Sequence, residues 1–272
     1  MTDQQPPDPA ALWPIYAQHA ALYMAGGPSP SLHLTDRAFF AGTGAPHVDL
    51  NQGALFGAAK EEDAREVVDL IIASGLPVLF GCSSGIARRL GPVLVAAGFR
   101  PMPSQEHLFW APGAPTPPEA SSSFDVRRVE SDVDLGAMQA IFEEAHGYAP
   151  ELTGAMFGRT LRTNDSMTGW IAWDGTEPVS FVLVTRAAST LSMWDVMTPA
   201  RHRRRGAARA VVGTALAVVA AAGPPIEQTL FWSSPAGRPL YESMGFLVAD
   251  RVDAWALGAS EADLVAVGAS LG

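Results

Sequence analysis

The sequence predicts an α/β protein, in which helices flank mixed (α+β) sheets, and two observations point to this class. Segments with helical and with strand periodicity alternate along most of the 272 residues. Residues 111–123, APGAPTPPEASSS, interrupt the alternation with Pro and Ser and without apolar periodicity, as is typical of a linker. We therefore expect two domains, 1–111 and 124–272, joined by a linker over 112–123.

A recurring order of elements favours an internal duplication. Residues 79–99 run from LFGCSS through a helical segment to AAGF, and residues 230–246 run from LFWSS through a shorter one to SMGF. The order of strand, double serine, helix and Gly-Phe is thus present twice, with a helix upstream and a strand downstream each time. This repetition predicts tandem domains of one architecture.

The individual elements follow from periodicity and from turn signals. Ser131 and Asp134 resemble a helix capping box, and Asp174-Gly175 is a hairpin signal. Before the linker we expect helices over 60–75 and 85–99 and strands over 77–84 and 104–111. After it we expect strands over 124–129, 169–175, 177–186, 191–198, 226–234 and 251–257, and helices over 131–148, 151–162, 207–222 and 237–245.

Composition excludes several classes of protein. The formal net charge of −10 argues against a nucleic-acid-coating role, which needs a basic surface. The single Cys82 excludes an internal disulfide and any multi-cysteine metal site. The start is acidic and proline-rich, unlike a signal peptide, and the longest apolar run (210–223) is shorter than the roughly 20 residues that span a bilayer. We expect a cytoplasmic protein without membrane or nucleic-acid partners.

The turn before the helix at 207–222 carries the most informative chemistry. Backbone N–H groups at a helix start are unpaired and lie at the positive end of the helix dipole. Gly206 allows close approach of a ligand, and Ala207 and Ala208 keep bulky side chains away. Five arginines add positive charge to this one turn: Arg201, Arg203, Arg204, Arg205 and Arg209. The pattern predicts a diphosphate cradle; a solvated basic turn is the alternative.

Two motifs in the second half resemble the GNAT superfamily of N-acetyltransferases. Arg203–Ala208 reads RRRGAA and fits the family signature Gln/Arg-x-x-Gly-x-Gly/Ala, with Pro199 upstream where the family often has V-x-P. Ser234 ends a strand and precedes LYESMGF (240–246), which fits the family's LYxxxGF. The order of elements from 124 to 257 also follows the family fold, whereas the N-terminal half resembles it only as a degenerate copy.

The resemblance implies a role for each matching residue. The loop 203–208, with Arg209, would hold the pyrophosphate of acetyl-CoA, a co-substrate, and no metal is implied. The strand 191–198 would splay from the strand 226–234, and main-chain groups at Val196 and Met197 would bind the pantetheine arm and polarise the thioester. Ser234 belongs to the same binding set, and Tyr241 matches the tyrosine that protonates the leaving thiolate in many members.

The general base and the acceptor pocket remain open at this stage. Asp195, on the strand that would carry the thioester, is the best placed carboxylate, with a turn-supporting aspartate as the alternative. Glu143, Glu144 and His146 could line the acceptor site or form a solvated helix face. The tryptophans at 170, 173, 194 and 232 could shape a pocket, although tryptophans in strands are more often core residues.

The N-terminal copy lacks the features that would bind a diphosphate. Its corresponding helix begins with Glu61, Glu62 and Asp63, which would repel one, and Leu94 stands where Tyr241 would be expected. We expect this half to complete the acceptor site, to cover the active half or to mediate a homodimer. Cys82 is expected to be a buried strand residue rather than a nucleophile.

The function expected from these features is acetyl-CoA-dependent N-acetylation. The acceptor would be the primary amine of a small molecule or peptide, attacking directly in a ternary complex. The alternative is a catalytically inactive CoA- or acyl-CoA-binding module with the same fold. A nucleic-acid contact by RHRRR is disfavoured by the acidic chain, and the acyl length of the donor is left open.

Overall fold

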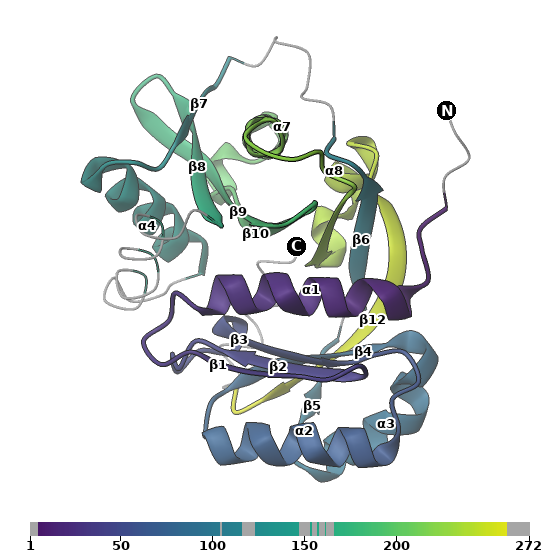
Figure 1. The fold of residues 1–272 in the computed structure, drawn as a ribbon. Helices are drawn as coiled ribbons and strands as arrows, with labels where there is room; N and C mark the ends of the chain where they lie inside the picture. The colour runs from purple at the N-terminus through teal and green to yellow at the C-terminus, as the bar shows by residue number, and fades with distance from the viewer. Residues whose placement is uncertain are drawn as a thin grey trace. The chain divides into compact units, whose positions relative to one another are not determined.

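The computed structural model describes residues 5–103, 105–115, 123–146, 153, 157, 161 and 166–259. The chain divides into two compact units. Unit 1 comprises the described residues of Met1–Trp110, Trp232–Glu242 and Phe246–Gly272, and unit 2 those of Ala111–Phe231 and Ser243–Gly245. Figure 1 shows the elements of each unit.

Unit 1 is built mainly from the N-terminal half of the chain. Its elements are α1 (Pro9–Met24), β1 (Ser31–Leu34), β2 (Ala38–Gly42), a 3-10 turn (Val48–Leu50), β3 (Asn51–Leu55), α2 (Glu61–Ser74), β4 (Val78–Ser83), α3 (Ser84–Ala96), β5 (Arg100–Pro101), most of β6 (Glu106–Pro112), most of α8 (Arg238–Ser243) and β12 (Leu247–Leu257). Within the unit the strands follow the order β1-β2-β3-β4-β12-β6. Only β3 and β4 in this set are paired in parallel.

The last strand of the chain belongs to unit 1, which differs from the expected division at 124–272. Strand β12 pairs antiparallel with β4 along 252–257 and with β6 along 247–252. These backbone hydrogen bonds to both neighbours tie β12 to strands from the N-terminal half. The two units divide between Trp110 and Ala111, and of the linker predicted over 112–123 only 112–115 and 123 are described.

Helices cover both faces of the unit 1 sheet, with α1 on one face and α2 and α3 on the other (Figure 1). The buried apolar residues of α2 and α3 recur at helical spacing, and they form one core cluster with Phe80, Phe99 and Trp255. Those positions are Val67, Val68, Ile71, Ile86, Leu90 and Leu94. Cys82 lies in this same cluster, as expected.

Unit 2 is the part that matched the expected elements most closely. It contains β7 (Asp125–Arg128), α4 (Asp132–His146), β8 (Met167–Asp174), β9 (Glu177–Ala187), β10 (Thr190–Met197), a 3-10 turn (Ala200–His202), α7 (Ala207–Ala221) and most of β11 (Gln228–Ser233). The strand order is β11-β10-β9-β8-β7. Ser131 and Asp134 form the expected capping box, because each backbone N–H donates to the other's side chain, at 3.0 Å and 3.1 Å.

The helices of unit 2 pack on opposite faces of its sheet. On β9, Phe181 stacks with Phe142 of α4, whereas Arg186 donates hydrogen bonds to the carbonyls of Val219 and Ala220 at the end of α7. Residues 181 and 186 are an odd number of positions apart on one strand, so their side chains lie on opposite faces. The expected mixed sheet flanked by helices is therefore confirmed.

The central parallel pair of unit 2 separates early. Strand β10 pairs with β11 only through Thr190 with Gln228 and Leu191 with Thr229, although β10 continues to Met197. The two strands therefore lose their register after the first two positions of β10. This is the splayed pair that the sequence resemblance implied.

Several elements differ from the expected set. No element was predicted for α1 or for β1, β2, β3 and β5, and β12 begins four residues earlier than the expected strand at 251. Of the weaker helix expected over 151–162, only Thr153, Phe157 and Leu161 are described, and these three are helical. The remaining positions of that segment lie outside the described residues.

Candidate functional site

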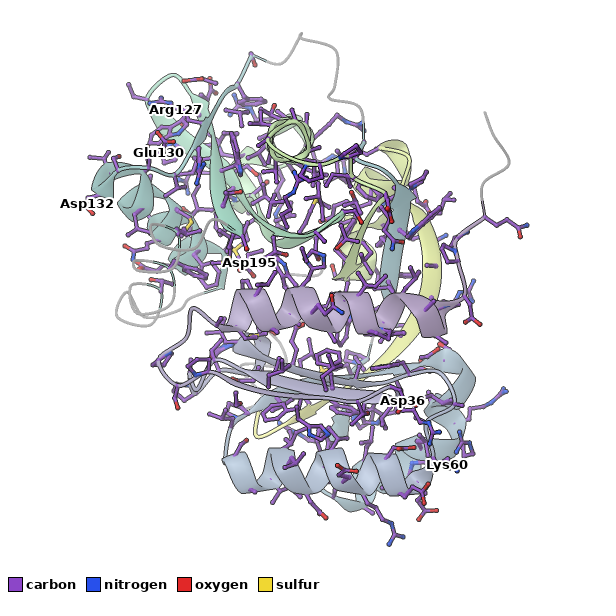
Figure 2. All side chains as sticks on the ribbon, in the orientation of Figure 1. Asp36, Lys60, Arg127, Glu130, Asp132 and Asp195 are labelled. Atoms are coloured by element: carbon purple, nitrogen blue, oxygen red, sulfur yellow. The ribbon has the colours of Figure 1, made fainter. Side chains whose placement is uncertain are left out.

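Strand β10 carries a β-bulge at Asp195 and Val196. Its register with β9 passes from Trp194 opposite Leu183 to Met197 opposite Phe181, so two residues of β10 face one residue of β9. Asp195 has a φ of 51°, in the left-handed region where aspartate is tolerated better than most residues. Figure 2 shows Asp195 on this strand. Such local backbone strain is typical of functional sites.

The bulge interrupts the register of β10 with its neighbours. Neither Asp195 nor Val196 has a place in the register of β9, and neither has one in that of β11. The carbonyl of Met197, by contrast, accepts a hydrogen bond of 2.8 Å from the Ser180 hydroxyl. Main-chain donors and acceptors at Val196 are thus positioned to bind an extended polar ligand or to stabilise a developing oxyanion.

Helix α7 begins without a side-chain cap. Gly206 is its N-cap, with φ 89° and ψ 0°, and in the described part of the chain this cap has no side-chain hydrogen bond. A Cβ added to Gly206 would meet no atom within 4 Å. Ala207 is buried and Ala208 is half-buried, and neither brings a large side chain of its own to the helix start. Helix α7 thus begins directly after Gly206, and an anion at its first turn stays a prediction.

Two of the five arginines are held by carboxylates of the same unit. Arg205 donates to Asp174 Oδ2 at 2.5 Å. Arg201 pairs with Glu144 and lies 3.6 Å from Glu177. These arginines shape the turn, and part of their charge is neutralised. Glu144 of α4 thus contacts the basic turn, which the sequence analysis did not foresee.

The other three arginines differ in their engagement. Arg203 donates to the carbonyl of Thr198 at 3.1 Å, and Arg209 donates to the carbonyl and hydroxyl of Ser243. Arg204 is exposed, has a φ of 63°, and makes no hydrogen bond or ion pair with the described part of the chain. Among the predicted cradle residues, Arg204 is therefore the cation most available to a ligand.

Tyr241 and Ser234 belong to unit 1. Tyr241 is buried; its ring centroid lies 5.4 Å from that of Phe109 and 6.3 Å from that of Phe246. Burial raises the pKa of Tyr241 to about 12, and a hydrogen bond with Ser233 opposes part of that rise. The hydroxyl is consequently protonated throughout the physiological range. Ser234 is half-buried and precedes the 3-10 turn that leads into α8.

The remaining candidates are mostly structural in their contacts. Trp194 and Trp170 are buried and donate to threonine hydroxyls on their own sheet, and Trp173 lies under the Arg127 guanidinium. Trp232 packs against Trp13 in unit 1. Glu143 contacts Thr153 at 3.2 Å, and the side chain of His146 lies outside the described set. Burial, with Asp253 nearby, raises the pKa of the Cys82 thiol, which keeps it protonated.

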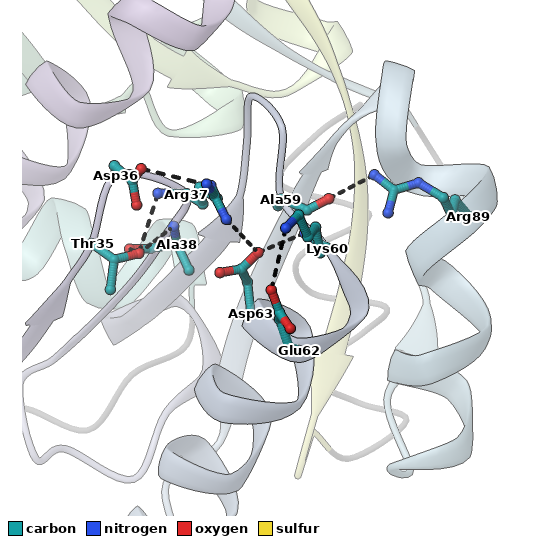
Figure 3. Close-up of polar contacts among 9 residues, drawn as sticks. All are labelled: Thr35, Asp36, Arg37, Ala38, Ala59, Lys60, Glu62, Asp63 and Arg89. Carbon is teal, nitrogen blue, oxygen red and sulfur yellow. Dashed lines mark hydrogen bonds and ion pairs between the residues drawn. The ribbon is translucent and has the colours of Figure 1, made fainter.

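The first turn of α2, the corresponding helix of unit 1, is capped by side chains of the same chain (Figure 3). The Asp63 carboxylate accepts a hydrogen bond of 2.6 Å from the Lys60 backbone N–H and lies 3.7 Å from the Arg37 guanidinium. Lys60 in turn pairs with Glu62 at 3.5 Å. The chain's own carboxylates therefore occupy the position that an anionic ligand would need, in agreement with the sequence analysis.

Sequence reasoning missed the acids that hold the basic turn. Asp174 and Glu177 flank the β8–β9 turn, and Glu177 lies 3.1 Å from the buried His202. The available signal was a pair of carboxylates around a hairpin in a chain whose arginines cluster in one turn.

In the described ranges, no group of three or more His, Cys, Asp or Glu residues could hold a metal ion. No helix among those ranges is long and apolar enough to cross a membrane.

Comparisons with known proteins place the fold. No family model matches the chain, and no curated protein matches it. A GCN5-related N-acetyltransferase from Kribbella flavida matches with a TM-score of 0.63 at 15% identity, over 90% of this chain and 96% of that one. One from Sphaerobacter thermophilus matches with a TM-score of 0.56 at 17% identity, over 93% and 94%.

A tandem protein matches as well. A tandem GNAT protein from the clavulanic acid biosynthesis pathway has a TM-score of 0.53 at 13% identity, over 88% of both chains. At such identities the likeness concerns architecture, and it spans both halves of the chain. This protein therefore has the fold of the GCN5-related N-acetyltransferases, in a tandem arrangement.

Proposed function

We propose that the chain is an acetyl-CoA-dependent N-acetyltransferase acting on a primary amine. One observation carries the proposal: the bulged end of β10 leads, through a short basic turn, into the open N-terminus of α7. The first feature offers main-chain groups for an extended acyl carrier, and the second offers N–H groups for its diphosphate. The open space at Gly206, where an added Cβ would meet nothing within 4 Å, supports a diphosphate at this position.

The proposed roles follow from these positions. The N–H groups at 206–208 and the Arg204 guanidinium bind the diphosphate of coenzyme A. The main chain at Val196 orients the thioester and stabilises the oxyanion that forms when the amine attacks its carbonyl carbon. Asp195 accepts the proton that the attacking amine loses. As the C–S bond breaks, Tyr241 is the proposed donor of a proton to the thiolate.

The test is release of free coenzyme A thiol from acetyl-CoA across a panel of amines. The panel contains amino acids, polyamines, aminoglycosides and peptide N-termini, each compared with a no-amine blank. Amine-dependent thiol release supports the proposal. Binding of coenzyme A with no thiol release on any amine would favour the inactive binding module, for which the weak acidity of buried Tyr241 is the supporting observation.

Substitution of Tyr241 by Phe sharpens that test. Phe keeps the ring contacts with Phe109 and Phe246 and removes only the hydroxyl. We expect turnover to fall by about 100-fold while the affinity for coenzyme A changes less than twofold. Ser233→Ala is the matched control, because it removes the partner hydroxyl and keeps the proposed acid. Weakened binding with unchanged turnover in Tyr241→Phe would contradict the assigned role.

A further inference from the structure

Unit 1 contains a cavity of about 390 Å³ that the proposed acetyl transfer does not use. Its lining mixes charged residues with short apolar ones, and all of them belong to unit 1. The lining residues are Ser84, Arg238, Val248, Ala249, Asp250 and Arg251. Cavities that bind small molecules span roughly 300–1,000 Å³, so the size of this one suits a small ligand.

The cavity lies where β12 runs past the end of β4. Strand β4 stops at Ser83, opposite Val252 of β12, and the chain continues directly into α3. Strand β12 extends beyond this point to Leu247, and its register with β6 skips Ala249, which forms a β-bulge. The stretch of β12 beyond the end of β4 and the first residue of α3 therefore border the same space.

Arg251 supplies the cavity with a cation. The residue is exposed, and its side chain makes no hydrogen bond or ion pair with the described part of the chain. Its backbone carbonyl accepts a hydrogen bond of 2.8 Å from the Ser84 hydroxyl, which holds β12 against the start of α3. A guanidinium carries its N–H donors in a planar fork that matches the two oxygens of a carboxylate. Arg251 is thus available to an anionic ligand.

A second cation, Arg238 of α8, lines the same cavity. Its Nε atom donates to Glu242 Oε1 at 2.7 Å, so part of its charge is neutralised. Buried His107 on β6 lies near both arginines: burial lowers the pKa of its imidazole, Arg238 and Arg251 lower it further, and Glu242 opposes them. Two guanidiniums that act on one imidazole also repel each other, and an anion between them would relieve this repulsion.

The acid of the lining limits the charge of such an anion. Asp250 forms no ion pair with either arginine among the described residues, and its Oδ2 atom accepts a hydrogen bond of 3.0 Å from the Trp13 indole. Because Glu242 already pairs with Arg238, Arg251 is the cation that remains to balance a ligand. One uncompensated guanidinium matches one negative charge, and Asp250 would repel a second.

We propose that this cavity binds a small organic monocarboxylate, with the carboxylate between Arg251 and Arg238 and a short carbon chain against Val248 and Ala249. The start of α3 adds to the attraction. Ser83, its N-cap, makes no side-chain capping hydrogen bond in the described part of the chain, so the first N–H groups contribute positive potential. The proposal is independent of acetyl transfer, because that activity assigns no role to the residues that line the cavity.

The experiment titrates the full chain with sodium butyrate at constant ionic strength and follows the backbone amide shifts by NMR. Butyramide keeps the carbon chain without the charge, butylamine inverts the charge, and inorganic phosphate at about pH 8 is mainly a dianion. We expect saturable shifts at 84–86 and 248–251 with butyrate, and an affinity about tenfold or more above that of each of the other three probes.

Variants separate the cavity from the rest of the charged surface. Arg251→Gln should weaken butyrate binding about fivefold or more. Arg88→Gln is the matched control, because Arg88 is an exposed arginine of α3 outside the lining, and it should bind as the wild type does. Asp250→Asn should strengthen phosphate binding about fivefold, since it removes the repelling charge.

Several results would overturn the proposal. These are the absence of saturable shifts with butyrate, equal affinity for butyrate and butyramide, shifts confined to other parts of the chain, or equal losses in Arg251→Gln and Arg88→Gln. If Arg251→Gln does not fold, the wild-type shift map and the probe comparison decide on their own. The titration contains no coenzyme A, so failure of acetyl transfer on every amine would contradict the proposed function and not this site.

Discussion

Two helices of this chain follow a strand that belongs to a parallel pair, and their N-termini differ in one respect that decides chemistry. Helix α2 begins with Asp63 bonded back to the Lys60 N–H, whereas α7 begins at Gly206 with no side-chain cap. The strands differ in the same sense. The pairing of β3 with β4 covers residues 52–55 and 79–82, but that of β10 with β11 stops after Leu191. In unit 1 the start of the helix is capped and the parallel strands stay paired, whereas in unit 2 the start of α7 is uncapped and the parallel strands separate.

The comparison shows that a few side chains decide whether the same arrangement of strand and helix is capped and filled or is left available to a ligand. In unit 1, the Phe80 ring lies so close to Gly53 that an added Cβ would meet it at 2.8 Å, so the space along the parallel pair is filled. Carboxylates then cap the helix, which stabilises it by about 1 kcal/mol. In unit 2, helix α7 has no such cap, and β10 pairs with β11 at only two positions. Stability given up at such positions is typical of ligand-binding sites.

The largest expected effect comes from filling the open helix start. In Gly206→Val, a branched side chain replaces hydrogen at a φ of 89° and projects into the space proposed for the diphosphate. We expect coenzyme A affinity to fall by 100-fold or more, measured by calorimetry. Gly75→Val is the matched control, because Gly75 caps α2 at its C-terminus with φ 67° and equally open surroundings. Equal loss of affinity in both variants would break the comparison.

The bulged carboxylate should matter for turnover rather than for binding. Asp195→Asn keeps a residue that tolerates the left-handed backbone and removes the charge. We expect kcat to fall about 100-fold, with coenzyme A affinity within twofold of the wild type. Steady-state rates with the best amine of the panel give the measurement, and Asp36→Asn on the surface of unit 1 is the control. An unchanged kcat would assign the base to another group.

Removal of the capping carboxylate of α2 should lower the stability of the protein without creating a second binding site for coenzyme A. Asp63→Ala removes the acceptor for the Lys60 N–H, and we expect the free energy of unfolding to fall by about 1 kcal/mol. Urea titration measures this, with Asp69→Ala on the exposed side of the same helix as the control. Coenzyme A stoichiometry should stay unchanged, because the filled strand pair remains. A second bound coenzyme A would show that the cap alone distinguishes the two units.

The smallest effect is expected for the exposed arginine of the turn. Arg204→Gln removes a cation with no partner in the described residues, and we expect coenzyme A affinity to fall three- to tenfold at low salt and less at high salt. Arg65→Gln in α2, where Arg65 pairs with Glu61, is the control and should not change affinity. Salt-independent loss would indicate a conformational role for Arg204.

The sequence allowed the start of α7 to be predicted, because Gly206 and two alanines after an arginine run are a local signal. The closed α2 was also predictable from Glu61, Glu62 and Asp63. Helix α1 was missed because residues such as Leu12, Trp13 and Tyr16 are followed by buried positions on several sides, which obscures helical periodicity.

Features that depend on residues distant in the chain could not be predicted. The bulge at Asp195 has no local sequence signal, since no glycine marks it. The contact of Arg201 with Glu144 joins residues from separate elements, and the pairing of β12 with β4 joins strands that are far apart in the sequence. Periodicity predicts that an element exists but not which strand it pairs with.

The central claim is that a diphosphate binds the start of α7 and not the start of α2. Amide hydrogen exchange of the wild type, with and without coenzyme A, tests it directly. The account predicts strong added protection of the N–H groups at 206–210 and none at 61–65. Absence of protection at 206–210, or equal protection at both helices, would contradict it.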